Sequence, residues 1–188
     1  MVRFKRTANE MLSRALNSLI LSIEIFNRPF EVGRKEAVLI LLHHSFEMLL
    51  KAIVFQKTDK IHVRGSKYTY SFDKCLDVCQ NELNVIFQHQ RVALSILDAH
   101  RDNAVHYFQD ISEDMLYVQA QASVTLFNNL LSKNFCKRLA DFLPSRVLPV
   151  STKPPKDIHL LLDSELERVD ELLCLGGKKG AQAAIMSP

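Results

Sequence analysis

Apolar residues recur at helical spacing along most of the chain, and this pattern defines the elements that we expect. Between Asn9 and Asn27 they lie three and four positions apart, which predicts an amphipathic helix with Asn9 as its N-cap. Pro29 should stop this helix. From Arg34 to Gln56 the chain is apolar around most of the helical circumference, which is typical of a helix at the centre of a bundle.

The pattern breaks over residues 57–74, where Gly65 and β-favouring residues predict a loop or small hairpin. A short helix should follow, capped by Ser71 and containing Cys75 and Cys79. Helical spacing resumes near Asn84, and a further helix is expected from about residue 112 to residue 136. The sequence therefore predicts an all-α fold, a four- to five-helix bundle with mostly short connections.

The character of the chain changes after Phe142. Four of the six prolines fall within residues 144–158, which predicts a linker that cannot sustain a helix. Residues 159–188 should form a short amphipathic helix, ending near Gly176 and Gly177, and a tail. We thus expect three parts: a bundle over 1–143, a linker over 144–158 and an appendage over 159–188.

Composition and charge narrow the class of protein. The 188 residues are 47% hydrophobic with only 5 Gly and 6 Pro, which excludes disorder throughout. A formal net charge of +3 is too small to indicate nucleic-acid binding by itself. No uninterrupted run of about 18 apolar residues occurs, and the basic N-terminus lacks a following apolar core with a cleavage site. We expect a cytoplasmic protein with no membrane partner.

The cysteines lack the spacing of a metal or disulfide framework. They are Cys75, Cys79, Cys136 and Cys174, with no C-x-x-C pair. Cys75 and Cys79 can share a helix face, but two thiols supply only two of the four ligands of a structural zinc site. His44-x-x-Glu47 reverses the order of the usual di-metal pattern in bundles and has no second copy. We therefore expect reduced structural thiols, no metal and no cofactor.

The stretch "HRDNAVH" gathers groups that can do chemistry: Arg101, Asp102 and His106. Asp102 and His106 share a helix face, whereas Arg101 and His106 are about 140° apart on a continuous helix. The three converge if Arg101 curls round, if the helix distorts, or if two copies meet across a dimer axis. An imidazole that moves protons and a guanidinium that stabilises phosphorane oxygens suit metal-free RNA cleavage. A solvated helix face is the alternative.

Residues 101–106 resemble the R-x4-6-H signature of the HEPN superfamily, and residues 43–54 resemble the core helix of a bacterial HEPN-like group. The resemblance covers roughly Asn9 to Lys133. It implies a homodimeric, metal-independent endoribonuclease, a toxin or phage-defence effector held by an antitoxin or other regulatory protein. Arg101 would stabilise the transition state, Asp102 would orient a partner and His106 would transfer protons. The alternative is a non-catalytic HEPN module that binds a nucleotide or a protein partner.

A polar stripe interrupts the predicted core helix. His44, Glu47 and Lys51 lie within about 60° of one another on a helix. In one interpretation, this stripe faces the cleft that contains Arg101 and His106, and Glu47 holds either Arg101 or His106 in place. The other is an ordinary i,i+4 pair between Glu47 and Lys51.

The loop between residues 57 and 74 mixes cations with aromatic rings, a combination that grips phosphates and stacks on unpaired bases. The residues that we expect to contact RNA are Lys60, Arg64, Lys67 and Tyr68. The alternative is a solvated loop, and RNA contact is expected only if the loop lies at the mouth of the same cleft.

Overall fold

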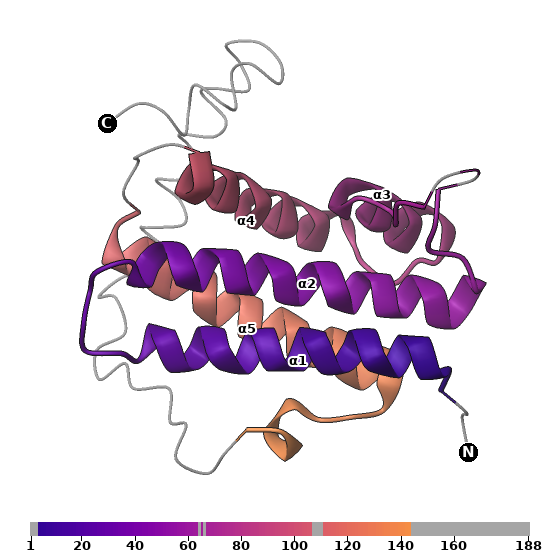
Figure 1. Ribbon diagram of the computed structural model, residues 1–188, viewed down its shortest axis with the longest axis horizontal. Helices are drawn as coiled ribbons and strands as arrows, with labels where there is room; N and C mark the ends of the chain where they lie inside the picture. Colours follow the sequence, from indigo (N-terminus) through magenta and orange to yellow (C-terminus); the bar gives the residue numbers. More distant parts are fainter. Residues whose placement is uncertain (1–3, 64, 66, 107–110, 144–188) are drawn as a thin grey trace.

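The computed structural model describes residues 4–63, 65, 67–106 and 111–143, which form an all-α bundle (Figure 1). Its helices are α1 (Arg6–Phe26), α2 (Arg34–Thr58), α3 (Phe72–Asp77), α4 (Gln88–His106) and α5 (Glu113–Phe135). A π-helical turn, η1 (Val78–Glu82), continues α3, and a 3-10 turn, η2 (Leu139–Asp141), follows α5. The predicted fold class is confirmed. The predicted linker and appendage lie outside the described residues.

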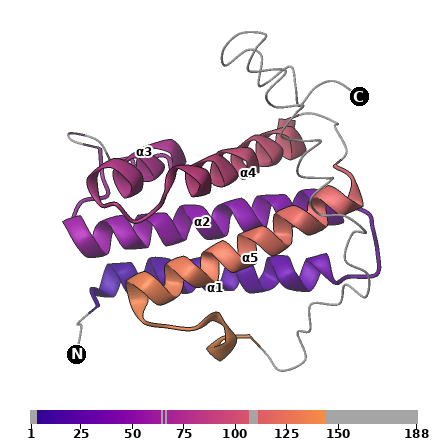
Figure 2. The same ribbon diagram turned by 180° about the vertical axis from the view of Figure 1, so that it is seen from behind.

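Helix α2 is the centre of the bundle, as the sequence predicts. α1 packs antiparallel along one side of it, α3 and α4 lie along the opposite side, and α5 crosses behind (Figures 1 and 2). Phe46 of α2 meets Phe127 of α5 edge to face, with ring centroids 5.7 Å apart, and both side chains are fully buried. Burying such large rings is the main source of stability in a bundle of this size.

In the described part of the chain, α2 alone is long and apolar enough to cross a membrane, with a mean hydropathy of 1.7 over its most apolar window. Within the bundle, 67% of that window is buried. A buried core helix passes this test by length and composition, so the result is weak support for a membrane span.

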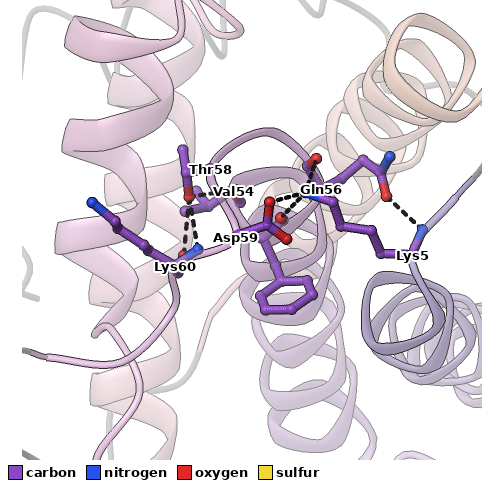
Figure 3. A network of polar contacts seen from close by, with 7 residues as sticks. Lys5, Val54, Gln56, Thr58, Asp59 and Lys60 are labelled. Carbon is purple, nitrogen blue, oxygen red and sulfur yellow. Dashed lines mark hydrogen bonds and ion pairs between the residues drawn. The ribbon is translucent and has the colours of Figure 1, made fainter.

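Helix α1 begins earlier than predicted, and Asn9 is not its N-cap. The helix starts at Arg6, and the Asn9 amide already donates to the Lys5 carbonyl at 3.0 Å. Lys5 precedes the helix and reaches the end of α2 (Figure 3), where its ammonium group contacts Gln56 O at 2.9 Å and Asp59 at 2.7 Å. A cation at the C-terminal end of a helix is favoured by the helix dipole. This tertiary contact fixes the start of α1.

Two other helix boundaries differ from the prediction. Helix α2 continues to Thr58. Its C-cap residue, Asp59, has a left-handed φ of 59°. Helix α4 begins at Gln88 and not near Asn84, because Asn84 is itself left-handed, with φ 50°. A left-handed residue breaks the helical path. Val85, which follows Asn84, is buried and turns back to donate to Cys79 O at 2.7 Å.

Several local predictions are confirmed. The Ser71 side chain accepts from the Lys74 amide and caps α3. The next helix begins near residue 112 as expected, and the structure shows that the Ser112 side chain caps it. The segment before α3 closes as a minimal hairpin, with one bridge between His62 and Thr69.

Candidate functional site

A polar cluster joins α2 to α4 on the side of the bundle where α4 packs. His43 Nε2 lies 2.8 Å from Asp98 Oδ1, and an Arg101 terminal nitrogen lies 2.7 Å from the same oxygen. The Arg101 nitrogen is 3.3 Å from His43 Nε2. We call His43, Asp98 and Arg101 the His–Asp–Arg cluster. It places a guanidinium at a fixed position between the core helix and α4.

The geometry assigns the hydrogen-bonding roles in this cluster. An ionised carboxylate only accepts hydrogen bonds, so both His43 Nε2 and the Arg101 nitrogen donate to Asp98. The contact between the two nitrogens then follows from their shared acceptor. The hydrogen bond from His43 is the main cause that lowers the pKa of Asp98, and the charges of His43 and Arg101 lower it further. Asp98 is therefore a carboxylate at neutral pH.

Packing shields the cluster from water on its inner side. The His43 side chain is only 7% exposed, while those of Asp98 and Arg101 are 24% and 27% exposed. The ring of Phe72, the first residue of α3, lies 4.4 Å from the His43 ring. Partial burial strengthens hydrogen bonds to charged groups, so this cluster should hold Arg101 more firmly than a surface pair would.

Asp102 and His106 lie toward the end of α4 and are more accessible. Asp102 Oδ1 binds the second terminal nitrogen of Arg101 at 2.8 Å, and its side chain is 51% exposed. His106 is exposed at the last residue of the helix. Helix α4 is continuous from Gln88 to His106, which excludes a distorted helix. Both terminal nitrogens of Arg101 contact aspartates, and no contact with His106 occurs among the described residues. Convergence across a dimer axis stays a prediction.

Two residues of the polar stripe on α2, Glu47 and Lys51, pair with each other and lie near α3. Glu47 pairs with Lys51 at 2.6 Å, which is the i,i+4 alternative. Both charges act on Cys75 of α3, where Lys51 lowers and Glu47 raises the thiol pKa. Glu47 therefore takes Lys51 as its partner, and His43 is the α2 residue that contacts Arg101. His44 is half-buried, and its Nδ1 has no hydrogen-bond partner among the described residues.

Sequence reasoning missed His43 and Asp98. The signal for His43 was its register: it lies four residues after Leu39 and three before Phe46, both of which are buried. A histidine at such a position points to the edge of the core and needs a partner there. Asp98 likewise lies four residues after the buried Leu94. That the two meet depends on how α4 packs on α2.

The loop with the expected RNA contacts lies away from the cluster. Figures 1 and 2 place the hairpin at the C-terminal end of α2, beside α3, whereas the C-terminal end of α4 lies over the N-terminal half of α2. Lys60, Lys67 and Tyr68 are exposed, and the Lys67 ammonium lies 5.9 Å from the Tyr68 ring centroid. Arg64 lies outside the described residues. One chain therefore does not bring this loop to the mouth of an Arg101 cleft.

The cysteines of α3 and η1 are buried. Burial raises the pKa of both Cys75 and Cys79 to about 12, which keeps these thiols protonated and unreactive. Among the described residues, no three His, Cys, Asp or Glu side chains converge as a metal-ligand set.

Fold and site together define a small helical bundle that holds an arginine between its core helix and α4 through a histidine and an aspartate. Residues 10–172 match a family described as a domain of unknown function, DUF3644, and the chain belongs to this family. No curated protein and no solved structure matches the chain. The matched region begins inside α1, includes the rest of the bundle and continues past residue 143.

Proposed function

We propose that the chain is a HEPN-type, metal-independent endoribonuclease that acts as a homodimer. The observation that carries the proposal is the placement of two groups on α4. Arg101 is fixed by His43 and Asp98 yet remains 27% exposed, and His106 is exposed at the end of the same helix. A positioned guanidinium and a free imidazole are the two groups that RNA transesterification needs.

In the proposed reaction the imidazole of His106 accepts the proton of the RNA 2′-hydroxyl, and the resulting oxygen attacks the neighbouring phosphorus. The bond from phosphorus to the 5′-oxygen breaks, and this oxygen takes up a proton from the solvent, to which His106 later returns the proton that it accepted. Arg101 stabilises the charge on the non-bridging oxygens, and Asp102 orients Arg101 through their 2.8 Å contact. The products are a 2′,3′-cyclic phosphate and a 5′-hydroxyl.

The test is cleavage of single-stranded RNA by the purified protein in EDTA, with single-stranded DNA as the comparison substrate. Arg101→Ala and His106→Ala should each lose activity on the order of a hundredfold or more. Matched controls exist on the same helix: Arg91, which is ion-paired to Asp77 at 2.6 Å, and the exposed His89. Arg91→Ala and His89→Ala should retain activity. Activity that requires Mg²⁺, or DNA cleavage at a comparable rate, would contradict the proposal.

Mixed dimers test the arrangement across the twofold axis. A heterodimer of Arg101→Ala and His106→Ala keeps one intact arginine on one chain and one intact histidine on the other. Co-expression with two different tags should therefore restore a fraction of the activity. If tagged pull-down recovers heterodimers that remain inactive, the site does not combine these two residues from different copies.

One observation favours a second candidate, a non-catalytic module of the same type that binds a nucleotide or a protein partner. Asp98 and Asp102 both contact Arg101, so two carboxylates already neutralise the guanidinium that would meet a phosphate. The same assays separate the candidates. A non-catalytic module leaves RNA intact at every protein concentration, and Arg101→Ala then changes only binding. A cellular role as a toxin or defence effector, with an antitoxin or other regulatory partner, belongs to the catalytic proposal.

A further inference from the structure

An open groove separates α4 from α5, on the side of the bundle that Figure 2 presents. Its volume is about 470 Å³. Ala93 and Leu94 of α4 face it from one side, and Val118, Ala122 and Leu126 of α5 face it from the other. No Asp, Glu, Lys or Arg side chain of the described residues lines it. The other lining residues are polar, namely His89, Gln90, Gln119, Gln121, Ser123, Thr125 and Asn129. Apolar side chains flanked by polar ones suit an amphipathic helix.

The groove exists because α4 and α5 pack on α2 but diverge from each other. They approach at one end, where the Lys133 ammonium lies 5.6 Å from the ring centroid of Phe87, just before α4. Among the described residues, α4 packs chiefly on α2. Ala122 is consequently exposed and Val118 only half-buried in the middle of α5. The described residues therefore leave one face of the bundle without a neighbouring helix.

Outside the described residues, the chain contains a segment of matching chemistry. Between residues 160 and 175, Leu162, Leu166, Val169 and Leu173 recur at the spacing of one helix face. The opposite face is polar and includes Glu171. The DUF3644 match ends at residue 172, so most of this segment belongs to the same family domain as the bundle. If residues 160–172 were an unrelated tail, the family match would be expected to end before them.

The connection is long enough for this segment to reach the groove. After α5 the chain turns back, and the Leu139 amide donates to Asn128 Oδ1 at 3.0 Å, which places η2 beside the middle of α5. The groove lies along the same part of α5, over residues 118–129. The predicted linker, residues 144–158, can span up to roughly 50 Å. No rearrangement of the bundle is needed.

We propose that residues 160–175 form an amphipathic helix that fills the groove between α4 and α5 of the same chain. Leu162, Leu166 and Leu173 pack against the apolar side chains of the groove, and the acidic face points to solvent. Helix α4 is then held between α2 and this segment.

Hydrogen exchange of the full-length chain tests the proposal. Amides of residues 160–173 should exchange slowly in the unmodified protein. Leu166→Glu places a charge on the apolar face of the segment and should speed exchange about tenfold or more, both in the segment and in peptides of α5 around Ala122. Ser164→Glu adds the same charge on the opposite face and is the matched control, which should leave both regions protected. Peptides of α1 and α2 report whether the bundle itself stays folded.

The reciprocal variant excludes a local effect within the segment. Ala122→Glu changes an exposed position of α5, so the bundle should fold, yet exchange of residues 160–173 should rise about tenfold or more. The proposal is overturned if these residues exchange at the unprotected rate in the unmodified chain, or if Ala122→Glu leaves them protected. It is also overturned if their protection disappears on dilution, because the groove would then be filled by the segment of a second copy.

Discussion

The His–Asp–Arg cluster predicts that Asp98→Asn destabilises the protein. The carboxylate accepts charge-assisted hydrogen bonds from His43 at 2.8 Å and Arg101 at 2.7 Å, and these bonds join α4 to α2. A hydrogen bond to a charged group contributes about 1.5–3 kcal/mol. The asparagine oxygen still accepts one bond and the site is partly exposed, so we expect a loss of about 1–2 kcal/mol in the free energy of unfolding.

Urea unfolding followed by circular dichroism measures this loss, and thermal unfolding should show a fall of about 2–4 °C for each kcal/mol. The pH dependence identifies the cause. The pKa of Asp98 is lowered from its ordinary value of 3.8, so its contribution is present above pH 3.8 and is lost as the pH falls through the lower, folded-state pKa. The difference between the native protein and Asp98→Asn should therefore shrink at pH values below 3.8.

Asp102→Asn is the matched control, since Asp102 contacts the same guanidinium from a side chain that is 51% exposed. An exposed pair contributes little, so this variant should lose about 0.5 kcal/mol or less. Equal effects of the two substitutions would refute the reasoning, because burial would then not decide the strength of the cluster. So would an Asp98→Asn effect that stays constant down to the acid transition.

Further predictions concern the thiols, a turn and a half-buried imidazole. Ellman's reagent should modify the exposed Cys136 in the folded protein but spare Cys75 and Cys79, whose pKa is raised to about 12; peptide mapping assigns the sites. Gly33→Ala should cost about 1 kcal/mol in urea unfolding, because Gly33 has φ +67° and its new methyl group would touch nothing. Burial lowers the pKa of His100 from 6.5, so the unfolding free energy should fall as the pH drops below 6.5, and His100→Gln should reduce that fall.

The sequence predicted those elements whose signal is local. The apolar circumference of α2 indicated a core helix, and the polar cap at Ser71 marked where α3 begins. Prediction from the sequence failed where a residue distant along the chain determines the start of a helix. Asn9 is a good N-cap by type, but Lys5 is anchored to the end of α2 and the helix starts there instead. Cap preference contributes about 1 kcal/mol, which one tertiary contact can outweigh.

The contacts of the candidate site also divide into local ones, which the sequence predicts, and long-range ones, which it does not. The pair formed by Arg101 and Asp102 is between neighbours on one helix, and the sequence placed both in the site. The contact of Arg101 with His43 crosses 58 positions of the chain and requires the observed packing of α4 on α2. Pattern alone gives two adjacent histidines, and only the rotation of α2 in the bundle selects His43 over His44 as the partner of Arg101.

The two carboxylates beside Arg101 differ in what they can contribute to the proposed reaction. Asp98 is the more buried, binds His43 as well, and is committed to joining the helices. Asp102 is more exposed and lies between Asp98 and His106 at four-residue spacing, so it connects the cluster to the exposed end of α4. Asp98 holds one terminal nitrogen of Arg101 and Asp102 holds the other. In the proposed reaction, Asp102 would release its nitrogen to a substrate phosphate while Asp98 keeps α4 joined to α2, so two acidic neighbours do not conflict with the proposal.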